Sequence, residues 1–143
     1  MKPPQEDESL SETLWSVARA LRHQSRLTLT PWDLTPSQSR AIESVLRHGA
    51  MRLSDLAHHL RIAPRSATEV VDDLSGLGLV ERRADPRDRR VTLVALTESG
   101  TTTGEAIRVA RQAEADRVFG TLSEHDRVAL ARILRELRSA IDG

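Results

Sequence analysis

The sequence predicts a mainly α-helical fold that carries one small β-hairpin, and three observations predict it. Apolar residues recur at steps of three and four along much of the 143-residue chain, as on one face of an α-helix. Between residues 79 and 96 this spacing is replaced by two short β-branched runs with turn residues between them. Threonine, serine or proline stands where several of the helices would begin.

The first helix is expected from Leu10 onward, because Leu14 and Leu21 continue an apolar stripe from there. Residues 28–34 include a proline and indicate a loop that follows this helix. Residues 1–9 are polar and acidic, and we expect them to form a disordered tail.

Two further helices are predicted from capping and spacing. Thr35 is expected to cap a helix that has Pro36 at its first position and Gln38 closing a capping box. That helix should stop near Gly49, where a C-terminal cap fits. A shorter helix is expected over residues 53–60, with its leucines on one side.

A tight turn at residues 61–63 leads to a third helix of this group, which should begin at Pro64. Gly78 stands where its C-terminal cap belongs, with the next residues folding back onto it. The apolar face expected on this helix consists of Ala67, Val70, Val71, Leu74 and Leu77.

A hairpin and two more helices complete the prediction. Residues 79–83 and 90–96 are the two strand candidates, and residues 84–89 between them have the composition of a turn. Thr97 is then expected to cap a long helix, and Ser123 a final amphipathic one.

Composition narrows the function classes. The chain has no cysteine, which excludes disulfides, thiolate metal sites and a cysteine redox sensor. It has no apolar run as long as a membrane span, which takes about 20 residues, and no hydrophobic signal segment, so we expect a cytoplasmic protein. The formal net charge is zero, but residues 82–90 contain five arginines against two aspartates. Positive charge is therefore local.

Two short helices joined by a tight turn and followed by a hairpin form a winged helix-turn-helix. The two helices cross closely, so their contact needs small side chains, and Ala57 and Ala67 lie on the two inward faces. The alternative is that both alanines are ordinary helix formers. The predicted fold class is a mainly α winged helix-turn-helix with a small β-hairpin wing.

The start of the helix after the turn carries the first candidate DNA-binding residues. Arginine, serine and threonine side chains there can contact base edges or phosphates in a major groove. Glu69 could accept a hydrogen bond from cytosine N4, but Glu69, Asp72 and Asp73 would repel phosphate unless turned away or paired. Each residue alone is also explained by simple solvation. The candidates are Pro64, Arg65, Ser66, Thr68 and Glu69.

The tip of the hairpin carries the second candidate set: Arg87, Asp88, Arg89 and Arg90. A β-ribbon with arginine at its tip is thin enough to enter a minor groove, where negative potential is focused. The alternative is a surface turn with local ion pairs, each of which contributes about 0–1 kcal/mol. The preceding helix pair favours the DNA interpretation.

The run from Leu77 to Gly100 closely resembles the signature of MarR-type regulators. It contains Gly-Leu-Val, then Asp-x-x-Asp-x-Arg in the wing, then Leu-Thr-x-x-Gly opening the next helix. Residues 53–57, Leu-Ser-Asp-Leu-Ala, also resemble the family's first helix-turn-helix element, and the resemblance covers roughly residues 10–141. The chain departs from the family at Ala63, where a polar cap usually precedes the recognition helix.

The resemblance implies a homodimer held by the N-terminal helix and the two C-terminal helices. Residues 10–34 would then join 97–143 in dimerisation, around a DNA-binding domain at 35–96 whose recognition helix is residues 64–77. It also implies that Asp88 orients Arg90 through an ion pair, while Arg87 and Arg89 lie nearest the groove. The dimer-interface candidates are Leu10, Leu14, Ile133, Leu137 and Ile141.

The resemblance further implies a small amphipathic or aromatic acid that binds between the dimer helices and the DNA-binding part and lowers DNA affinity. For each candidate the alternative is plain: tryptophan as core filler and arginine as solvated surface. The candidate pocket residues are Trp15, Arg19, His23, Arg26, Trp32 and Arg40.

No catalytic motif is visible in the sequence. His23, His48, His58, His59 and His125 lack metal-ligand spacing, so we expect no metal and no cofactor. The sequence therefore predicts a dimeric, sequence-specific DNA-binding regulator rather than an enzyme, most simply a repressor of a near-palindromic operator. The alternative is a winged-helix module that binds protein instead of DNA, which the acidic residues of the recognition helix would suit.

Overall fold

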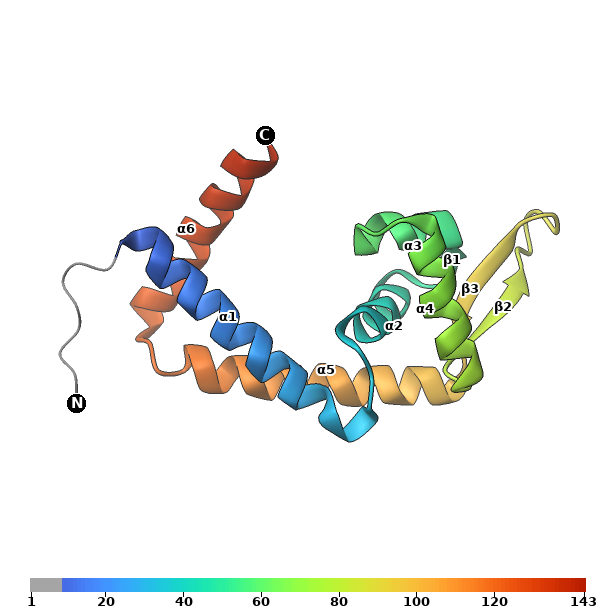
Figure 1. The fold of residues 1–143 in the computed structure, drawn as a ribbon, viewed down its shortest axis with the longest axis horizontal. Coiled ribbons are helices and arrows are strands. Elements are labelled where there is room, and N and C mark those ends of the chain that lie inside the picture. Colours follow the sequence, from blue (N-terminus) through green and yellow to red (C-terminus); the bar gives the residue numbers. More distant parts are fainter. Residues whose placement is uncertain (1–8) are drawn as a thin grey trace. The chain divides into compact units, whose positions relative to one another are not determined.

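The computed structural model describes residues 9–143, and its elements confirm the predicted fold class. Helices precede, separate and follow the strands of one small sheet (Figure 1). The predicted acidic tail lies outside the described residues except for Ser9, which caps the first helix. The elements are α1 (Leu10–Leu29), a 3-10 turn η1 (Thr30–Trp32), α2 (Pro36–His48), β1 (Met51–Arg52), α3 (Leu53–Leu60), α4 (Pro64–Gly76), β2 (Val80–Ala84), β3 (Thr92–Leu96), α5 (Glu98–Phe119) and α6 (Glu124–Asp142).

The predicted helix starts are confirmed by their hydrogen bonds. The side chain of Thr35 accepts from the N–H of Gln38, whose own side chain accepts from the N–H of Thr35, which closes the capping box of α2. Ser123 caps α6 by accepting from the N–H of Asp126. The loop expected over residues 28–34 is shorter than predicted, because α1 runs to Leu29 and a 3-10 turn follows.

The sheet has one strand that the sequence did not reveal. Its order is β1-β3-β2, with both pairs antiparallel, and the pairs Met51–Val94 and Arg52–Leu93 join β1 to β3. A strand of two residues has no readable period, and its partner is distant in the chain. The hairpin strands themselves begin one and two residues later than predicted, at Val80 and Thr92.

The end of α4 explains why the hairpin starts where it does. The N–H of Leu79 donates to the carbonyl of Leu74, and the N–H of Gly78 donates to that of Ser75, which together form a Schellman motif. Gly78 has φ 74°, a left-handed conformation that favours glycine. Leu79 turns back into the core, whereas Leu77, expected on the apolar face, is 57% exposed because the helix has ended there.

The described chain up to Arg108 and the segment Val109–Gly143 form two compact units. In the first, side chains of α2, α3, α4 and the sheet enclose one core, in which Leu56, Val71 and Leu74 are completely buried. Burying each such side chain contributes about 1.5–3 kcal/mol relative to leaving it exposed. In the second unit, α6 has no buried residue. Within residues 9–143 no helix is both long and apolar enough to cross a membrane.

Candidate nucleic-acid interface

The crossing of α3 and α4 sets the geometry of the candidate interface. Ala57 and Ala67, the small residues predicted at this crossing, are 4% and 0% exposed. Between the helices, Arg61 adopts a left-handed conformation with φ 55°, and its N–H donates to the carbonyl of His58. The N–H of Ile62 donates to the carbonyl of Ala57, so the turn is closed by backbone hydrogen bonds. The first turn of α4 is thereby held in a fixed direction.

That first turn is open to solvent. Pro64, Arg65, Ser66 and Glu69 are exposed, and Thr68 is half-buried. The hydroxyl of Thr68 donates to the carbonyl of Pro64 at 3.0 Å, so its oxygen keeps only acceptor capacity for another group. All five predicted recognition-helix residues therefore lie on one accessible stretch of α4.

The N-terminus of α4 has no side-chain cap. Ala63 occupies the N-cap position in extended conformation and contributes only its carbonyl, which accepts from the N–H of Ala67. The departure from the family pattern at Ala63 is therefore real in structure as well as in sequence. Backbone donors of the first turn that a serine or threonine cap would engage remain available to an anion.

An ion pair between α4 and the wing offsets the charge of one of the acidic side chains of α4 that would repel DNA phosphates. Nη2 of Arg82, on β2, lies 2.6 Å from Oδ1 of Asp72 on α4. The sequence showed that Asp72 needed a partner but did not identify Arg82, since only the packing of β2 beside α4 brings them together (Figure 1). The pair also links the two predicted contact elements.

The tip of the wing is organised by its two aspartates. The Oδ1 of Asp85 accepts from the N–H of Arg87 at 2.9 Å, and the Oδ1 of Asp88 accepts from the N–H of Arg90 at 3.1 Å. The carboxylate of Asp88 also accepts from Nε and Nη2 of Arg90 at 3.1 and 3.2 Å, which is the predicted ion pair in bidentate form. The side chain of Arg90 is still 90% exposed.

These contacts shift the ionisation of Asp88. The side chain and then the backbone N–H of Arg90 hold the pKa of the Asp88 carboxyl below its ordinary value of 3.8, and the charge of Arg52 on β1 adds to this. Arg52 is an exposed cation near the wing that the sequence did not single out. With Arg87 and Arg89 also exposed at the tip, the wing presents several guanidinium groups to solvent.

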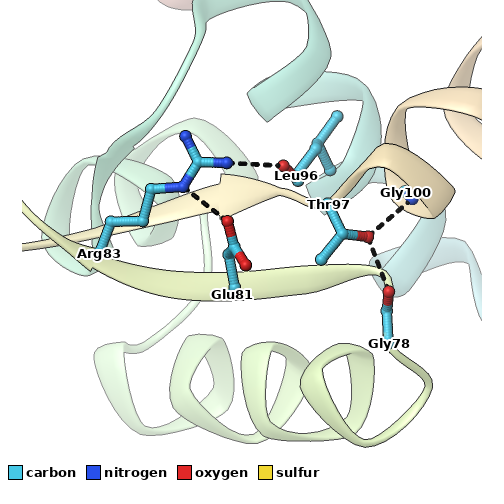
Figure 2. A network of polar contacts seen from close by, with 6 residues as sticks. All are labelled: Gly78, Glu81, Arg83, Leu96, Thr97 and Gly100. Carbon is cyan, nitrogen blue, oxygen red and sulfur yellow. Dashed lines mark hydrogen bonds and ion pairs between the residues drawn. The ribbon is translucent and has the colours of Figure 1, made fainter.

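The base of the wing is tied to the helix that follows it (Figure 2). The hydroxyl of Thr97 donates to the carbonyl of Gly78 at 2.7 Å and accepts from the N–H of Gly100 at 3.0 Å. Along the hairpin, Arg83 donates to the carboxylate of Glu81 and to the carbonyl of Leu96. Thr97 therefore caps α5, as predicted. Its hydroxyl also links Gly78, just after the end of α4, to the first turn of α5.

Gly100 explains the glycine of the Leu-Thr-x-x-Gly signature. A Cβ built on Gly100 would lie 1.8 Å from the carbonyl oxygen of Leu79, which is backbone and cannot swing aside. Only glycine allows α5 to approach the start of the hairpin this closely. The wing is thus anchored at its base by direct backbone packing.

The six candidate ligand residues fall into separate groups. Trp15, Arg19, His23 and Arg26 follow one another at helical spacing on α1 and are exposed. Trp32 packs against the core from the 3-10 turn. Arg40 lines a different hollow, between α2 and α3.

The five candidate dimer residues are all exposed in the single chain. Leu10 and Leu14 on α1 are 88% and 45% exposed. On α6, Ile133, Leu137 and Ile141 are 43%, 46% and 80% exposed. Apolar side chains of α1 and α6 are thus left uncovered within the described chain.

A helix pair crossing on small residues, an open recognition helix and an arginine-tipped wing define a winged helix-turn-helix protein. The family model described as "MarR family" matches residues 34–92. An HTH-type transcriptional regulator of Mycobacterium tuberculosis is 32% identical over 121 residues, covering 85% of each chain. The HTH-type transcriptional repressor MdtR of Bacillus subtilis is 28% identical over 109 residues, 76% of this chain and 70% of that protein.

The fold agrees with these matches. A solved structure of a MarR family protein from Bacillus stearothermophilus superposes with a TM-score of 0.82 at 28% identity, covering 94% of each chain. The chain belongs to the MarR family, and it is a DNA-binding transcriptional regulator.

Proposed function

We propose that the protein is a homodimeric repressor that binds a near-palindromic operator through the first turn of α4 and the β2–β3 wing. The observation that carries the proposal is the arrangement of these two elements side by side, both exposed and joined by the Arg82–Asp72 ion pair. The α4 start enters the major groove, and the wing arginines reach the neighbouring minor groove.

Within α4, Arg65 and Ser66 are the residues with free choice of base or phosphate partners, because both are exposed at the first turn. The uncapped backbone N–H groups of that turn suit a phosphate oxygen. Glu69 stands next to them and suits the N4 amino group of cytosine rather than a phosphate. The neutralised Asp72 lies further along the helix, which confines contact to its beginning.

The homodimer is supported by the uncovered apolar faces on α1 and α6. A second copy that covers Leu14 and Leu137 with their equivalents would remove exposed apolar surface of both helices from water. Two copies of α4 at fixed separation would read half-sites about one helical turn, or 10 base pairs, apart.

Repression and ligand release extend the proposal. Repression is supported by the relative MdtR, which is named a transcriptional repressor. It is also the simplest consequence of a tight operator complex, because the bound protein blocks transcription. The exposed α1 face of Trp15, Arg19, His23 and Arg26 offers one aromatic ring and cationic groups to a small aromatic or amphipathic acid. Binding there would change the separation of the two recognition helices and lower DNA affinity. The site of action is the cytoplasm.

The central test is selection of bound duplexes from a random pool by the purified full-length protein. We expect a near-palindrome to emerge. On that duplex, the double variant Arg89→Ala/Arg90→Ala should bind roughly a hundredfold or more weakly in a gel-shift titration, since each contact to DNA contributes about 1–3 kcal/mol. The matched control Arg22→Ala/Arg108→Ala removes the same charge from exposed sites outside the interface and should bind almost normally. Equal affinity of the two double variants would contradict the wing assignment.

Dimerisation is tested separately by light scattering. Leu137→Asn should shift the mass toward that of a monomer, because it places an amide in the proposed interface. Leu77→Asn is the matched control, since Leu77 is 57% exposed but lies at the end of α4. A monomeric wild-type protein, or an unchanged mass for Leu137→Asn, would refute the proposed interface.

A further inference from the structure

A hollow of about 200 Å³ lies between α2 and α3, and none of its lining residues belongs to the wing or to α4. Its walls come from the face of α2 opposite to the buried Ala41, Ile42 and Val45, and from the end of α3. The polar side chains that line it are Arg40, Glu43, Ser44, Arg47, His48 and His59. Apart from one acid, every one of them can donate a hydrogen bond.

Arg40 is exposed, and two long hydrogen bonds hold its guanidinium beside the hollow. Its Nη1 donates to the carbonyl of Leu60 at 3.4 Å, and its Nη2 donates to Oγ of Ser37 at 3.5 Å. A guanidinium has five N–H donors in a planar fork, so Arg40 keeps donors beyond these two for an anion in the hollow that it lines. A pre-positioned arginine loses little conformational entropy when an anion binds.

The one acid of the lining is already matched. Glu43 lies 3.5 Å from Nη2 of Arg47, one helical turn further along α2. This pair offsets the carboxylate, so the positive charge of Arg40 remains as the net charge of the lining with both histidines neutral. An anion that enters would therefore meet a lining whose formal charge is positive.

Two histidines also line the hollow, His48 from α2 and His59 from α3. The rings of His48 and His59 are stacked, with centroids 4.6 Å apart and planes at 12°. Each imidazole carries at least one N–H donor in either protonation state.

We infer that this α2–α3 hollow binds a phosphate-type anion, which either a free phosphorylated small molecule or the DNA backbone supplies. The chemistry is the same for both sources: oxygen acceptors that meet Arg40, Arg47, Ser44 and the histidine N–H groups. The backbone source rests on the proposed function, whereas the free anion does not. Leu60, which borders the hollow, directly precedes the turn that leads into α4, so an anion here would bind beside the turn of the helix-turn-helix.

The site is tested with inorganic phosphate and the full-length chain. We would follow the ring protons of His48 and His59 by NMR during a phosphate titration at constant ionic strength with chloride. Saturable shifts are expected, with affinity about tenfold or more weaker in Arg40→Gln, because a charge-assisted hydrogen bond contributes about 1.5–3 kcal/mol. Arg47→Gln should weaken binding too, and its exposed side chain makes it safe for the fold. Arg22→Gln removes an exposed charge elsewhere and should leave the titration unchanged.

Absence of saturable shifts, or equal phosphate affinity in Arg47→Gln and Arg22→Gln, would overturn the inference. The source is decided on the selected operator. If the DNA backbone fills the hollow, Arg47→Gln should lower the slope of log affinity against log salt by about 0.9 for each phosphate that the variant no longer neutralises. An unchanged slope together with a positive phosphate titration assigns the hollow to a free anion. A wild-type protein that binds no duplex would refute the proposed function and leave the phosphate titration standing as an independent result.

Discussion

The two compact units of the chain differ in where their apolar side chains find cover. In the unit that ends at Arg108, Leu56 and Leu74 are 0% exposed, and helices and sheet enclose the core completely. In the unit that begins at Val109, α6 has no buried residue, and Leu137 is 46% exposed. The helix-turn-helix and the sheet therefore enclose a core within the chain, whereas α1 of the first unit and α6 of the second keep exposed apolar side chains that the proposed homodimer would cover.

This difference suits a regulator of the proposed kind. A self-contained core keeps the first turn of α4 and the wing in one fixed arrangement, which specific contacts require. An association surface elsewhere sets the separation of two such units, and a ligand can change a separation more easily than a packed core. The proposed function would thus place DNA recognition in a closed core and regulation at an association surface.

The largest expected effect is on stability, and it compares a buried leucine of the first unit with an exposed leucine of α6. Leu74→Ala should lower the free energy of unfolding by about 2–5 kcal/mol in urea titrations, since it leaves a cavity in a closed core. Leu137→Ala removes the same atoms from an exposed position. It should cost less in unfolding and appear mainly as weaker self-association in analytical ultracentrifugation. Equal losses for the two variants, with association unaffected, would erase the distinction between the units.

A second pair of variants sharpens the account of how the first unit holds its wing. Gly100→Ala should destabilise by about 1–3 kcal/mol, because its Cβ would overlap the backbone of Leu79. Gly76→Ala, on α4 with nothing within 4 Å of the added Cβ, should leave stability unchanged or raise it by up to about 1 kcal/mol. Thermal unfolding of both variants measures the difference. A neutral Gly100→Ala would contradict the close approach of α5 to the hairpin.

The smallest expected effect concerns the ionisation of the wing. Since Arg90 lowers the pKa of Asp88, their pair is complete above the ordinary value of 3.8 and is lost as the pH falls through the lower folded value. Carboxyl-carbon NMR should show Asp88 titrating below 3.8, and Arg90→Gln should move its midpoint upward. The overall unfolding free energy should hardly change, because the pair is exposed. An unchanged titration midpoint of Asp88 in Arg90→Gln would show that Arg90 does not lower the pKa of Asp88.

The helices of the fold could be predicted from local signals. These signals are the capping box at Thr35, the proline at the start of α4 and the left-handed glycine after that helix. Each acts within a few residues, so it can be recognised from neighbouring positions in the sequence. Leu77 was assigned wrongly to the apolar face, because the exact last turn of a helix depends on its cap geometry. The strand β1 was missed because two residues carry no period.

The candidate interface divides in the same way. The Asp88–Arg90 pair lies within a turn of the chain and followed from the motif, whereas Arg82–Asp72 joins a strand to a helix and did not. The nearness of Arg52 to the wing also depends on the pairing of β1 with β3. The packing of α2 against α3 places His48 beside His59. No sequence pattern predicts this contact, because the two residues lie on different helices.

The sequence by itself determined the order of helices and hairpin, the exposed start of α4 and the arginines at the wing tip, since caps, periodicity and turn chemistry act over short distances. Only the tertiary structure decided which charges meet, where α5 touches the hairpin and which apolar faces stay uncovered. These features depend on residues far apart in the chain, whose approach is set by the packing of the whole core.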